Sequence, residues 1–218
     1  MSLQADVMRA LYGADIWANF EPSRAPVDAQ GWNGDHPSLA RLAAMPGTSK
    51  LIIDVGVWKG QSTINMALAL KAAGIDACVI AVDTFLGSPE HWTGKLALFD
   101  RAHGMPDLYW RFLANVHAAG VTSYIVPMPQ TSVTAAKVLR ECGVPAPDLV
   151  HIDAAHEYEE VLRDSEEYYA LLKNGGLLIG DDYSYGWRGV IRGANEFAAK
   201  HCLALTIDNP KWIVQKPV

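Results

Sequence analysis

Four side chains in the second half of the chain have types and spacing suited to binding a cation. Asp153 and His156 lie three positions apart in HIDAAHEYE, and Asp181 and Asp182 are adjacent in LLIGDDY. Each pair follows a short apolar run typical of a buried strand. If the two strands are neighbours, they lie about 4.8 Å apart, and three carboxylates converge at one sheet edge. Such oxygen ligands suit Mg²⁺, although a single aspartate more often caps a turn.

The same cluster could also accept a proton. Near neutral pH the imidazole of His156 can take a proton from a substrate hydroxyl. A divalent cation would lower the pKa of that hydroxyl and fix its position. Asp153 is the other candidate base, and an ordinary histidine at a helix start is equally compatible with position 156. His151, inside the apolar run, is expected to be a packed core residue.

A second candidate site follows an earlier apolar run. The segment IIDVGVWKGQS contains Asp54, Gly56 and Gly60 and leads into a helical pattern. Glycines let the backbone turn tightly and approach a ligand, and a helix N-terminus offers unpaired N–H groups. The next run, ACVIAVD, ends in Asp83, whose carboxylate could accept both hydroxyls of a ribose. The turn and the acid together predict a nucleoside site.

The residues between the two glycines indicate which nucleoside fits. A dinucleotide site requires G-x-G-x-x-G because its second glycine admits the pyrophosphate, but Trp58 occupies that position. Asp54 is poorly placed beside a pyrophosphate and well placed beside an ammonium group. S-adenosylmethionine has an ammonium group, a sulfonium charge and no phosphate, so the pattern favours it. An NAD-dependent oxidoreductase is the alternative enzyme class. Lys59, within the loop, is expected to be exposed.

The elements that must position these residues alternate along the chain. Five apolar runs, each followed by a helical or polar stretch, predict a parallel sheet covered on both faces, and two more strands follow at the end. Gly175 is expected to cap the helix before the fifth strand. The predicted strands cover 51–55, 77–83, 121–127, 148–153, 176–182, 203–208 and 211–216, and the clearest helices cover 61–73, 131–141, 158–173 and 189–201.

Composition limits the partners that the chain can have. Half of its 218 residues are apolar, as in a globular protein with one large core. No run approaches the ~18–20 apolar residues of a membrane span, no signal peptide is recognised, and three cysteines lack metal-ligand spacing. We therefore expect a cytoplasmic protein without a membrane partner. A net charge of −6 without a basic block argues against nucleic acid and favours a small-molecule acceptor; a homo-oligomer is compatible with the sequence.

Three further regions could contribute to a site. Residues 1–47 are interrupted by prolines and glycines, and we expect an irregular, partly helical segment that packs on the core or forms a lid over it. Trp187, shortly after the adjacent aspartates, is the best placed of the tryptophans for a sugar platform, although most tryptophans are packing residues. Residues 90–92 could contact adenine or form an ordinary polar loop.

The chain resembles the seven-stranded class of S-adenosylmethionine-dependent methyltransferases through IIDVGVWKGQS, AVDTF, LLKNGGLLIGDD and the terminal strand pair. The resemblance implies a Rossmann-like α/β fold within a methyltransferase domain of residues 48–218. Its mostly parallel sheet would have the order 3-2-1-4-5-7-6, with the last strand antiparallel and helices on both faces. The implied cofactor-binding residues are Asp54, Gly56, Trp58, Gly60, Ser62, Asp83 and Thr84.

The aspartate and histidine motifs narrow this resemblance. IDAAHEYEEVLRD followed by LLKNGGLLIGDDY is similar to the family of macrocin O-methyltransferase and other metal-dependent sugar O-methyltransferases; cephalosporin-hydroxylase-like proteins share its core. The resemblance implies that Asp153, Asp181 and Asp182 bind Mg²⁺ or another divalent cation and that His156 is a base candidate. We therefore expect Mg²⁺-assisted O-methylation of a hydroxyl on a sugar or other small polar acceptor. A methyltransferase-like binding module without turnover is the non-enzymatic alternative.

Overall fold

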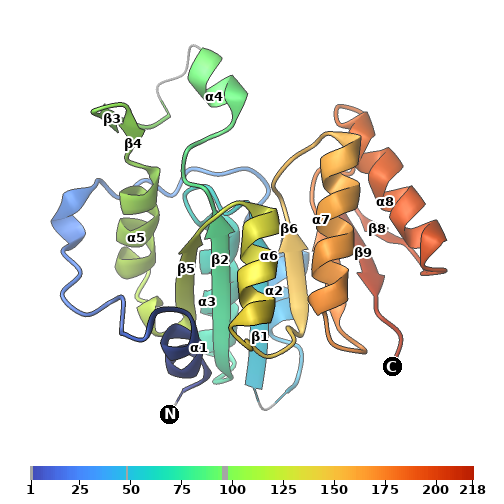
Figure 1. The fold of residues 1–218 in the computed structure, drawn as a ribbon, viewed down its shortest axis with the longest axis horizontal. Helices are drawn as coiled ribbons and strands as arrows, with labels where there is room; N and C mark the ends of the chain where they lie inside the picture. The colour runs from blue at the N-terminus through green and yellow to red at the C-terminus, as the bar shows by residue number, and fades with distance from the viewer. Residues whose placement is uncertain (1, 48, 95–97) are drawn as a thin grey trace.

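A single seven-stranded sheet runs through the centre of the molecule (Figure 1). The computed structural model describes residues 2–47, 49–94 and 98–218. The strand order is β5-β2-β1-β6-β7-β9-β8, with β9 antiparallel to both its neighbours and the other pairs parallel. The predicted order and the antiparallel last strand are confirmed. The strands are β1 (Ser49–Val55), β2 (Asp76–Asp83), β5 (Ile125–Pro129), β6 (Leu149–Ile152), β7 (Leu177–Gly180), β8 (Thr206–Asp208) and β9 (Lys211–Gln215).

Helices cover both faces of the sheet. One face packs against α1 (Leu3–Tyr12), α6 (Ser132–Glu141), α7 (Tyr158–Leu171) and α8 (Arg188–Lys200). The other packs against α2 (Pro37–Ala43), α3 (Gln61–Ala72) and α5 (Leu108–Ala118). The remaining elements are short: α4 (Pro89–Thr93), the strand pair β3 (Arg101–Ala102) and β4 (Met105–Pro106), and 3₁₀ turns at Pro22–Arg24 and Thr122–Tyr124. No helix in the described part of the chain combines the length and hydropathy that a membrane span requires.

The strand sequences explain this two-sided packing. In β1, Ile53 and Val55 face one core and Ile52 faces the other, and all three are buried. Burial on both faces requires a continuous apolar run rather than an alternating one. The edge strand β5 tolerates Pro127 because an edge residue need not donate to a ladder. Its free carbonyl groups accept hydrogen bonds from the N-terminal segment, including one from the hydroxyl of Tyr12 at 2.6 Å.

Three local predictions differ from the structure. The strand predicted over 203–208 begins at Thr206, three residues later than predicted. The third strand begins at Ile125, four residues later than predicted, because residues 122–124 form a 3₁₀ turn before it. Gly175 does not cap a helix: α7 ends at Leu171, and Leu172 follows in an extended conformation. Gly175 instead has a φ of 76° in the turn before β7, where its N–H donates to the carbonyl of Lys216 at 2.9 Å. The left-handed conformation predicted for Gly175 is therefore confirmed, but its predicted place at the end of a helix is wrong.

Candidate active site

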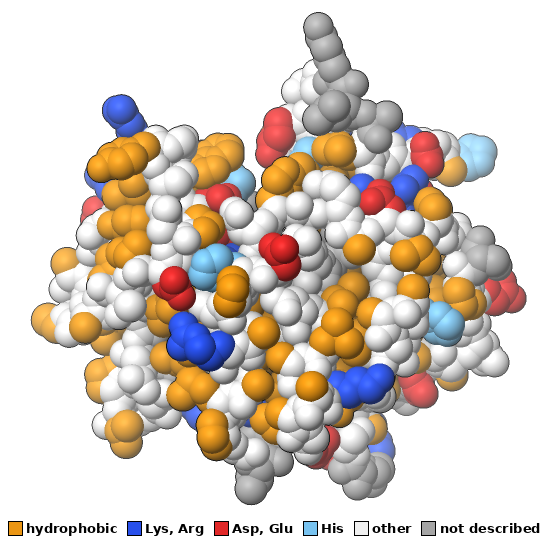
Figure 2. Space-filling view, turned by 180° about the vertical axis from the view of Figure 1, so that it is seen from behind, with side chains coloured by type: hydrophobic (Ala, Val, Ile, Leu, Met, Phe, Trp, Pro, Cys, Tyr) orange, Lys and Arg blue, Asp and Glu red, His pale blue; other side chains and the backbone are white. Residues whose placement is uncertain are grey.

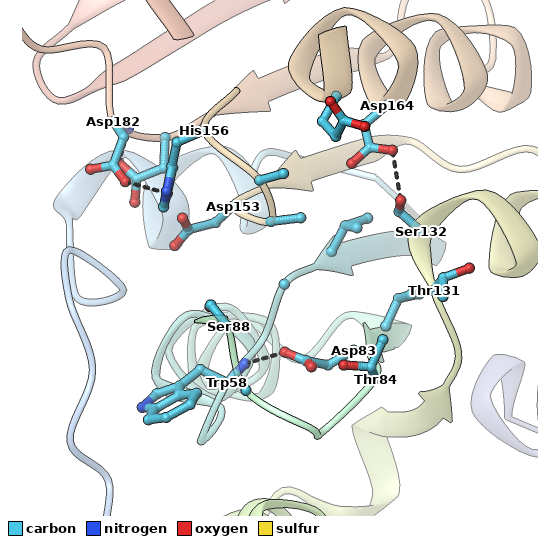
Figure 3. Close-up of a pocket in the computed structure, with 18 of the residues that line it drawn as sticks. Trp58, Asp83, Thr84, Ser88, Thr131, Ser132, Asp153, His156, Asp164 and Asp182 are labelled. Atoms are coloured by element: carbon cyan, nitrogen blue, oxygen red, sulfur yellow. Dashed lines mark hydrogen bonds and ion pairs between the residues drawn. The ribbon is translucent and has the colours of Figure 1, made fainter. Parts of the chain in front are cut away.

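A cavity of about 630 Å³ opens at the carboxyl ends of the parallel strands, within the range of small-molecule sites. In Figure 1 this is the end of the sheet from which β2 leads into α4, opposite both termini. Its walls come from the loops after β1, β2, β5, β6 and β7, with a contribution from the N-terminal segment. Figure 3 shows two groups of polar side chains in this cavity, one around Asp83 and one around Asp153 and His156.

The glycine loop after β1 fits closely beneath the cavity. Gly56 has a φ of 84°, and a Cβ at this position would lie 1.9 Å from the carbonyl oxygen of Asp153. Only glycine is compatible with both its conformation and this contact. Trp58 also has a left-handed backbone, with a φ of 52°, and its N–H donates to Asp83 at 2.8 Å. Gly56 and Trp58 both line the cavity, as the predicted cofactor loop requires.

Asp83 is held by the backbone and retains acceptor capacity. One carboxylate oxygen accepts the N–H of Trp58, and the other accepts the N–H of Phe85 at 2.7 Å. A carboxylate has about four acceptor positions, so it can also bind a ligand. Burial raises the pKa of Asp83 above its ordinary value, although the backbone donors act in the opposite direction. Thr84 lies beside it on the cavity wall.

Asp54 lies behind the loop rather than on the cavity wall. Its side chain is fully buried and accepts hydrogen bonds from Ser62 at 2.8 Å and Thr63 at 2.5 Å. Its other oxygen lies 2.7 Å from Nδ1 of His151. Burial alone would raise the pKa of Asp54, but these partners hold it below its ordinary value. His151 is in the core, as expected, but it belongs to a polar network there.

Gly60 also supports the loop from behind. It has a φ of 94°, and a Cβ there would lie 2.9 Å from the ring of Phe112. Gly60, Asp54 and Ser62 are thus placed where they shape the loop and the start of α3. Their predicted direct contact with a cofactor stays a prediction.

The second polar group combines acidic side chains with an imidazole. One ligand atom from each of Asp153, His156 and Asp182 lies within 4.8 Å of the others. Nε2 of His156 is 2.9 Å from Oδ2 of Asp182, yet it is buried with no well-aligned hydrogen-bond partner among the described residues. Burial, followed by the charge of Asp181, raises the pKa of Asp153 well above its ordinary value. A divalent cation between Asp153 and Asp182 would relieve the repulsion between these carboxylates, so their oxygens fit one.

Asp181 has a different environment from its two predicted partners. Its side chain is buried, and one oxygen forms an ion pair with Lys211. The other accepts the N–H of Asp182 at 2.7 Å. The structure therefore brings Asp153, Asp182 and His156 together and pairs Asp181 with a lysine. The sequence does not indicate that Lys211 is a buried partner of Asp181, because a lysine at the start of a strand normally reaches solvent.

The N-terminal segment lies across the glycine loop and completes one wall. Asp28 forms a 2.5 Å ion pair with Lys59, and Gln30 accepts a hydrogen bond from the indole of Trp58 at 3.2 Å. The expectation that Lys59 is exposed is wrong: its exposure is 1%. Further cavity residues that the sequence did not reveal are Trp32, Asn33, Thr131, Ser132 and Asp164. Asp164 ends the motif IDAAHEYEEVLRD but was given no role there, and the other four come from segments without a motif, so only the fold identifies them.

Aromatic rings line the cavity in two groups. Trp187 stacks on His156, with ring centroids 4.1 Å apart, and both residues line the cavity. His91 packs against Trp58, with centroids 4.3 Å apart, and is stacked on Trp32. His91 and Glu90 line the cavity, whereas Trp92 is not among its lining residues, and contact of this loop with adenine stays a prediction. Basic side chains are scattered rather than gathered on the face in Figure 2.

Several solved structures with the same fold are methyltransferases. An O-methyltransferase from Bacillus cereus, in complex with S-adenosylhomocysteine, aligns with a TM-score of 0.58 and 15% identity, over 97% of this chain and 91% of that one. The O-methyltransferase TomG from Streptomyces achromogenes is involved in tomaymycin synthesis, and its structure is in complex with S-adenosylmethionine. It aligns with a TM-score of 0.61 and 15% identity, over 96% of this chain and 90% of that one. A calicheamicin methyltransferase aligns with a TM-score of 0.58 and 16% identity, over 82% of this chain and 76% of that one. At such identities the likeness establishes the fold alone.

The sequence itself matches one family model. No curated protein gives a significant match, but the model Methyltransf_24, described as a methyltransferase domain, matches residues 53–183. The matched region begins in β1 and ends just after Asp182, so it contains the glycine loop, Asp83 and the cation cluster. The match also decides between the two enzyme classes that the sequence left open, in favour of methyl transfer. The chain belongs to the Methyltransf_24 family and is an S-adenosylmethionine-dependent methyltransferase.

Proposed function

We propose that this protein transfers the methyl group of S-adenosylmethionine to a hydroxyl oxygen of a small polar acceptor, assisted by a divalent cation. The observation that carries the proposal is that one cavity contains both Asp83 and the cluster of Asp153, His156 and Asp182. A cofactor bound at Asp83 and an acceptor bound at the cluster would share this enclosed space. O-methyltransferases among the structures of the same fold are consistent with it.

The charge of the cavity supports a cationic cofactor. Among the described residues, its lining contains one basic side chain, Arg163, and seven acidic ones: Asp83, Glu90, Asp153, Glu160, Asp164, Asp181 and Asp182. Acidic walls attract a sulfonium and an ammonium group and repel a pyrophosphate. In the proposed arrangement Asp83 accepts the ribose hydroxyls, and the sulfonium is directed toward Asp153. The same charge disfavours an acceptor that carries phosphate groups.

The cation cluster supports a hydroxyl acceptor. Asp153 and Asp182 are the proposed oxygen ligands, and the cation they hold would lower the pKa of the acceptor hydroxyl and fix its position. His156 is the proposed base: its Nε2 takes the proton as the acceptor oxygen bonds to the methyl carbon and the carbon–sulfur bond breaks. Burial lowers the pKa of His156, but Asp182 and nearby acids raise it overall.

The aromatic side chains support an acceptor with a flat, partly apolar face. Trp187 is 42% exposed and Trp32 is 53% exposed, although both line the cavity. Exposed tryptophans beside a polar cluster can cover the apolar face of a ring while the cluster binds its hydroxyls. A sugar ring has this combination of surfaces.

Titration calorimetry followed by a transfer assay tests the proposal. We expect S-adenosylmethionine to bind and S-adenosylhomocysteine to form when sugars, glycosides and phenols are offered with Mg²⁺. Chelation with EDTA should suppress product formation, and added Mg²⁺ or Mn²⁺ should restore it. Absence of cofactor binding at millimolar concentration would contradict the proposal. Activity insensitive to EDTA would leave a metal-independent methyltransferase, and binding without transfer to any acceptor would support a non-catalytic module.

A further inference from the structure

Lys211 is a fully buried cation beside the proposed cation site. It begins β9, next to β7 in the sheet, and its side chain has no solvent exposure. Its Nζ pairs with Asp181 and lies 3.3 Å from Nε2 of His151. A buried ammonium group is strongly unfavourable unless it is paired and hydrogen-bonded. Asp181 supplies the charged partner that a buried ammonium group requires.

The pair acts on the backbone of the adjacent aspartate. Asp181 uses one oxygen for Lys211 and the other for the N–H of Asp182, at 2.7 Å. Asp182 has a φ of 58°, a left-handed conformation that is unfavourable for a residue with a side chain. In this conformation its carboxylate lies 2.9 Å from Nε2 of His156. The orientation of Asp182 thus depends on a carboxylate that Lys211 holds in place.

The pair also sets the charge of the cluster. Asp153, Asp181 and Asp182 together would bring three negative charges to one sheet edge, and like charges in a partly buried site oppose one another. Lys211 compensates the charge of Asp181. The two remaining carboxylates match the charge of one divalent cation.

We propose that Lys211 is a positioning residue of the cation site, which occupies Asp181 and fixes the turn that presents Asp182 to His156. The proposal rests on the proposed function for the presence of a cation. It differs from the three-aspartate site expected from the sequence, because Asp181 supports the site without binding the cation. Lys211 itself touches neither cofactor nor acceptor in this arrangement.

Three variants separate these roles: Lys211→Met, Asp181→Asn and the double variant. Each single variant leaves one buried charge without its partner, whereas the double variant removes both charges and keeps an oxygen at position 181 for the N–H of Asp182. Mn²⁺ affinity, measured by titration calorimetry, should fall at least about tenfold in Asp181→Asn, which leaves the charge of Lys211 unbalanced beside the site, and return to within about threefold of wild type in the double variant. Lys216→Met, which removes a lysine just beyond the other end of β9, is the matched control and should bind Mn²⁺ normally.

Amide hydrogen exchange of residues 182–187 gives a second readout that does not require a cation. Exchange should be faster in both single variants and return to the wild-type rate in the double variant. Exchange that fails to recover in the double variant would overturn the proposal. A loss of cation affinity in Asp181→Asn that persists in the double variant would also overturn it, because it would make Asp181 a ligand. A wild-type protein that binds no Mn²⁺ would contradict the cation part of the proposed function. The exchange rates would then still decide whether Lys211 fixes the turn.

Discussion

Asp54 and Asp83 lie near the carboxyl ends of neighbouring strands, and their partners give the two carboxylates different roles. Asp54 is surrounded by Ser62, Thr63 and His151, so its oxygens are used inside the protein. Asp83 accepts two backbone N–H groups and still lines the cavity. Of the two, Asp83 is the residue from which direct binding of a ribose is expected.

Replacement of Asp83 by asparagine should weaken cofactor binding. The variant keeps the shape of the side chain but removes the charge that strengthens hydrogen bonds to ribose hydroxyls. S-adenosylhomocysteine affinity should fall by about 10- to 100-fold, the equivalent of about 1.5–3 kcal/mol for hydrogen bonds to a charged group. Calorimetry measures this directly. Asp76→Asn, at the exposed other end of β2, is the control; equal affinities for the two variants would exclude the ribose role.

Sequence patterns identified acidic residues at strand ends better than they identified buried lysines. Asp83, Asp153 and Asp182 were singled out because each follows an apolar run, and the structure places all three on the cavity. Lys59 and Lys211 are both buried because each meets a carboxylate about 30 positions away in the chain. No local pattern carries information about such distant partners, so hydropathy alone predicts exposed lysines.

At the scale of elements, most strands and helices follow from hydrophobic runs and their spacing. The exceptions occur where local turn chemistry competes with the pattern. Residues 121–124 begin the third predicted strand, but residues 122–124 form a 3₁₀ turn, and Gly175 takes a left-handed conformation in a loop rather than at a helix end. The sheet order came from the family resemblance, since strand spacing in the sequence does not determine which strands are neighbours.

The glycine loop gives a test of element packing. Gly56→Ala places a Cβ 1.9 Å from the carbonyl oxygen of Asp153, so the loop after β1 and the end of β6 cannot both keep their positions. Gly74 has a similar φ of 66° but open space around it. Gly74→Ala should therefore show only the conformational penalty, about 1 kcal/mol.

We expect Gly56→Ala to abolish measurable S-adenosylhomocysteine binding and to lower Tm by more than Gly74→Ala. Calorimetry and thermal unfolding distinguish the two variants. The left-handed conformation is common to both, so the difference between them reports the contact with β6. Equal losses in both variants would mean that conformation alone, and not this contact, makes Gly56 necessary.

At the scale of the whole molecule, the N-terminal segment is joined to the core through a charged contact. Asp28 pairs with the buried Lys59 in the glycine loop and lies 3.3 Å from Arg111 of α5. Asn115 accepts the N–H of Asp28 and donates to its carbonyl, both at 2.8 Å. Trp32, which lines the cavity, follows Asp28 by four residues. A change in this contact should therefore affect both global stability and the cavity wall. The expectation that residues 1–47 pack on the core or form a lid over it can be tested through the same contact.

The pH dependence of unfolding tests this contact. Burial raises the pKa of Asp28, but hydrogen bonds from Lys59 and the Gln30 backbone, with the charges of Lys59 and Arg111, lower it overall. A carboxyl group whose pKa is lower in the folded state stabilises the fold above its unfolded pKa, about 3.9. That stabilisation is lost as the pH falls through the folded-state pKa. Asp28→Asn should therefore lower Tm most near neutral pH, and its Tm should converge with that of the wild type below about pH 4.

Asp35→Asn is the matched control, because Asp35 is an exposed acid in the same segment. Its Tm should stay close to that of the wild type at each pH between about 3 and 7, since exposed charges contribute little to stability. Convergence at low pH is the decisive feature, because protonation of Asp28 in the wild type leaves Lys59 without its partner, just as the substitution does. No Tm difference at any pH would show that Asp28 stabilises the fold through its backbone contacts with Asn115, which the substitution keeps, and not through its charge.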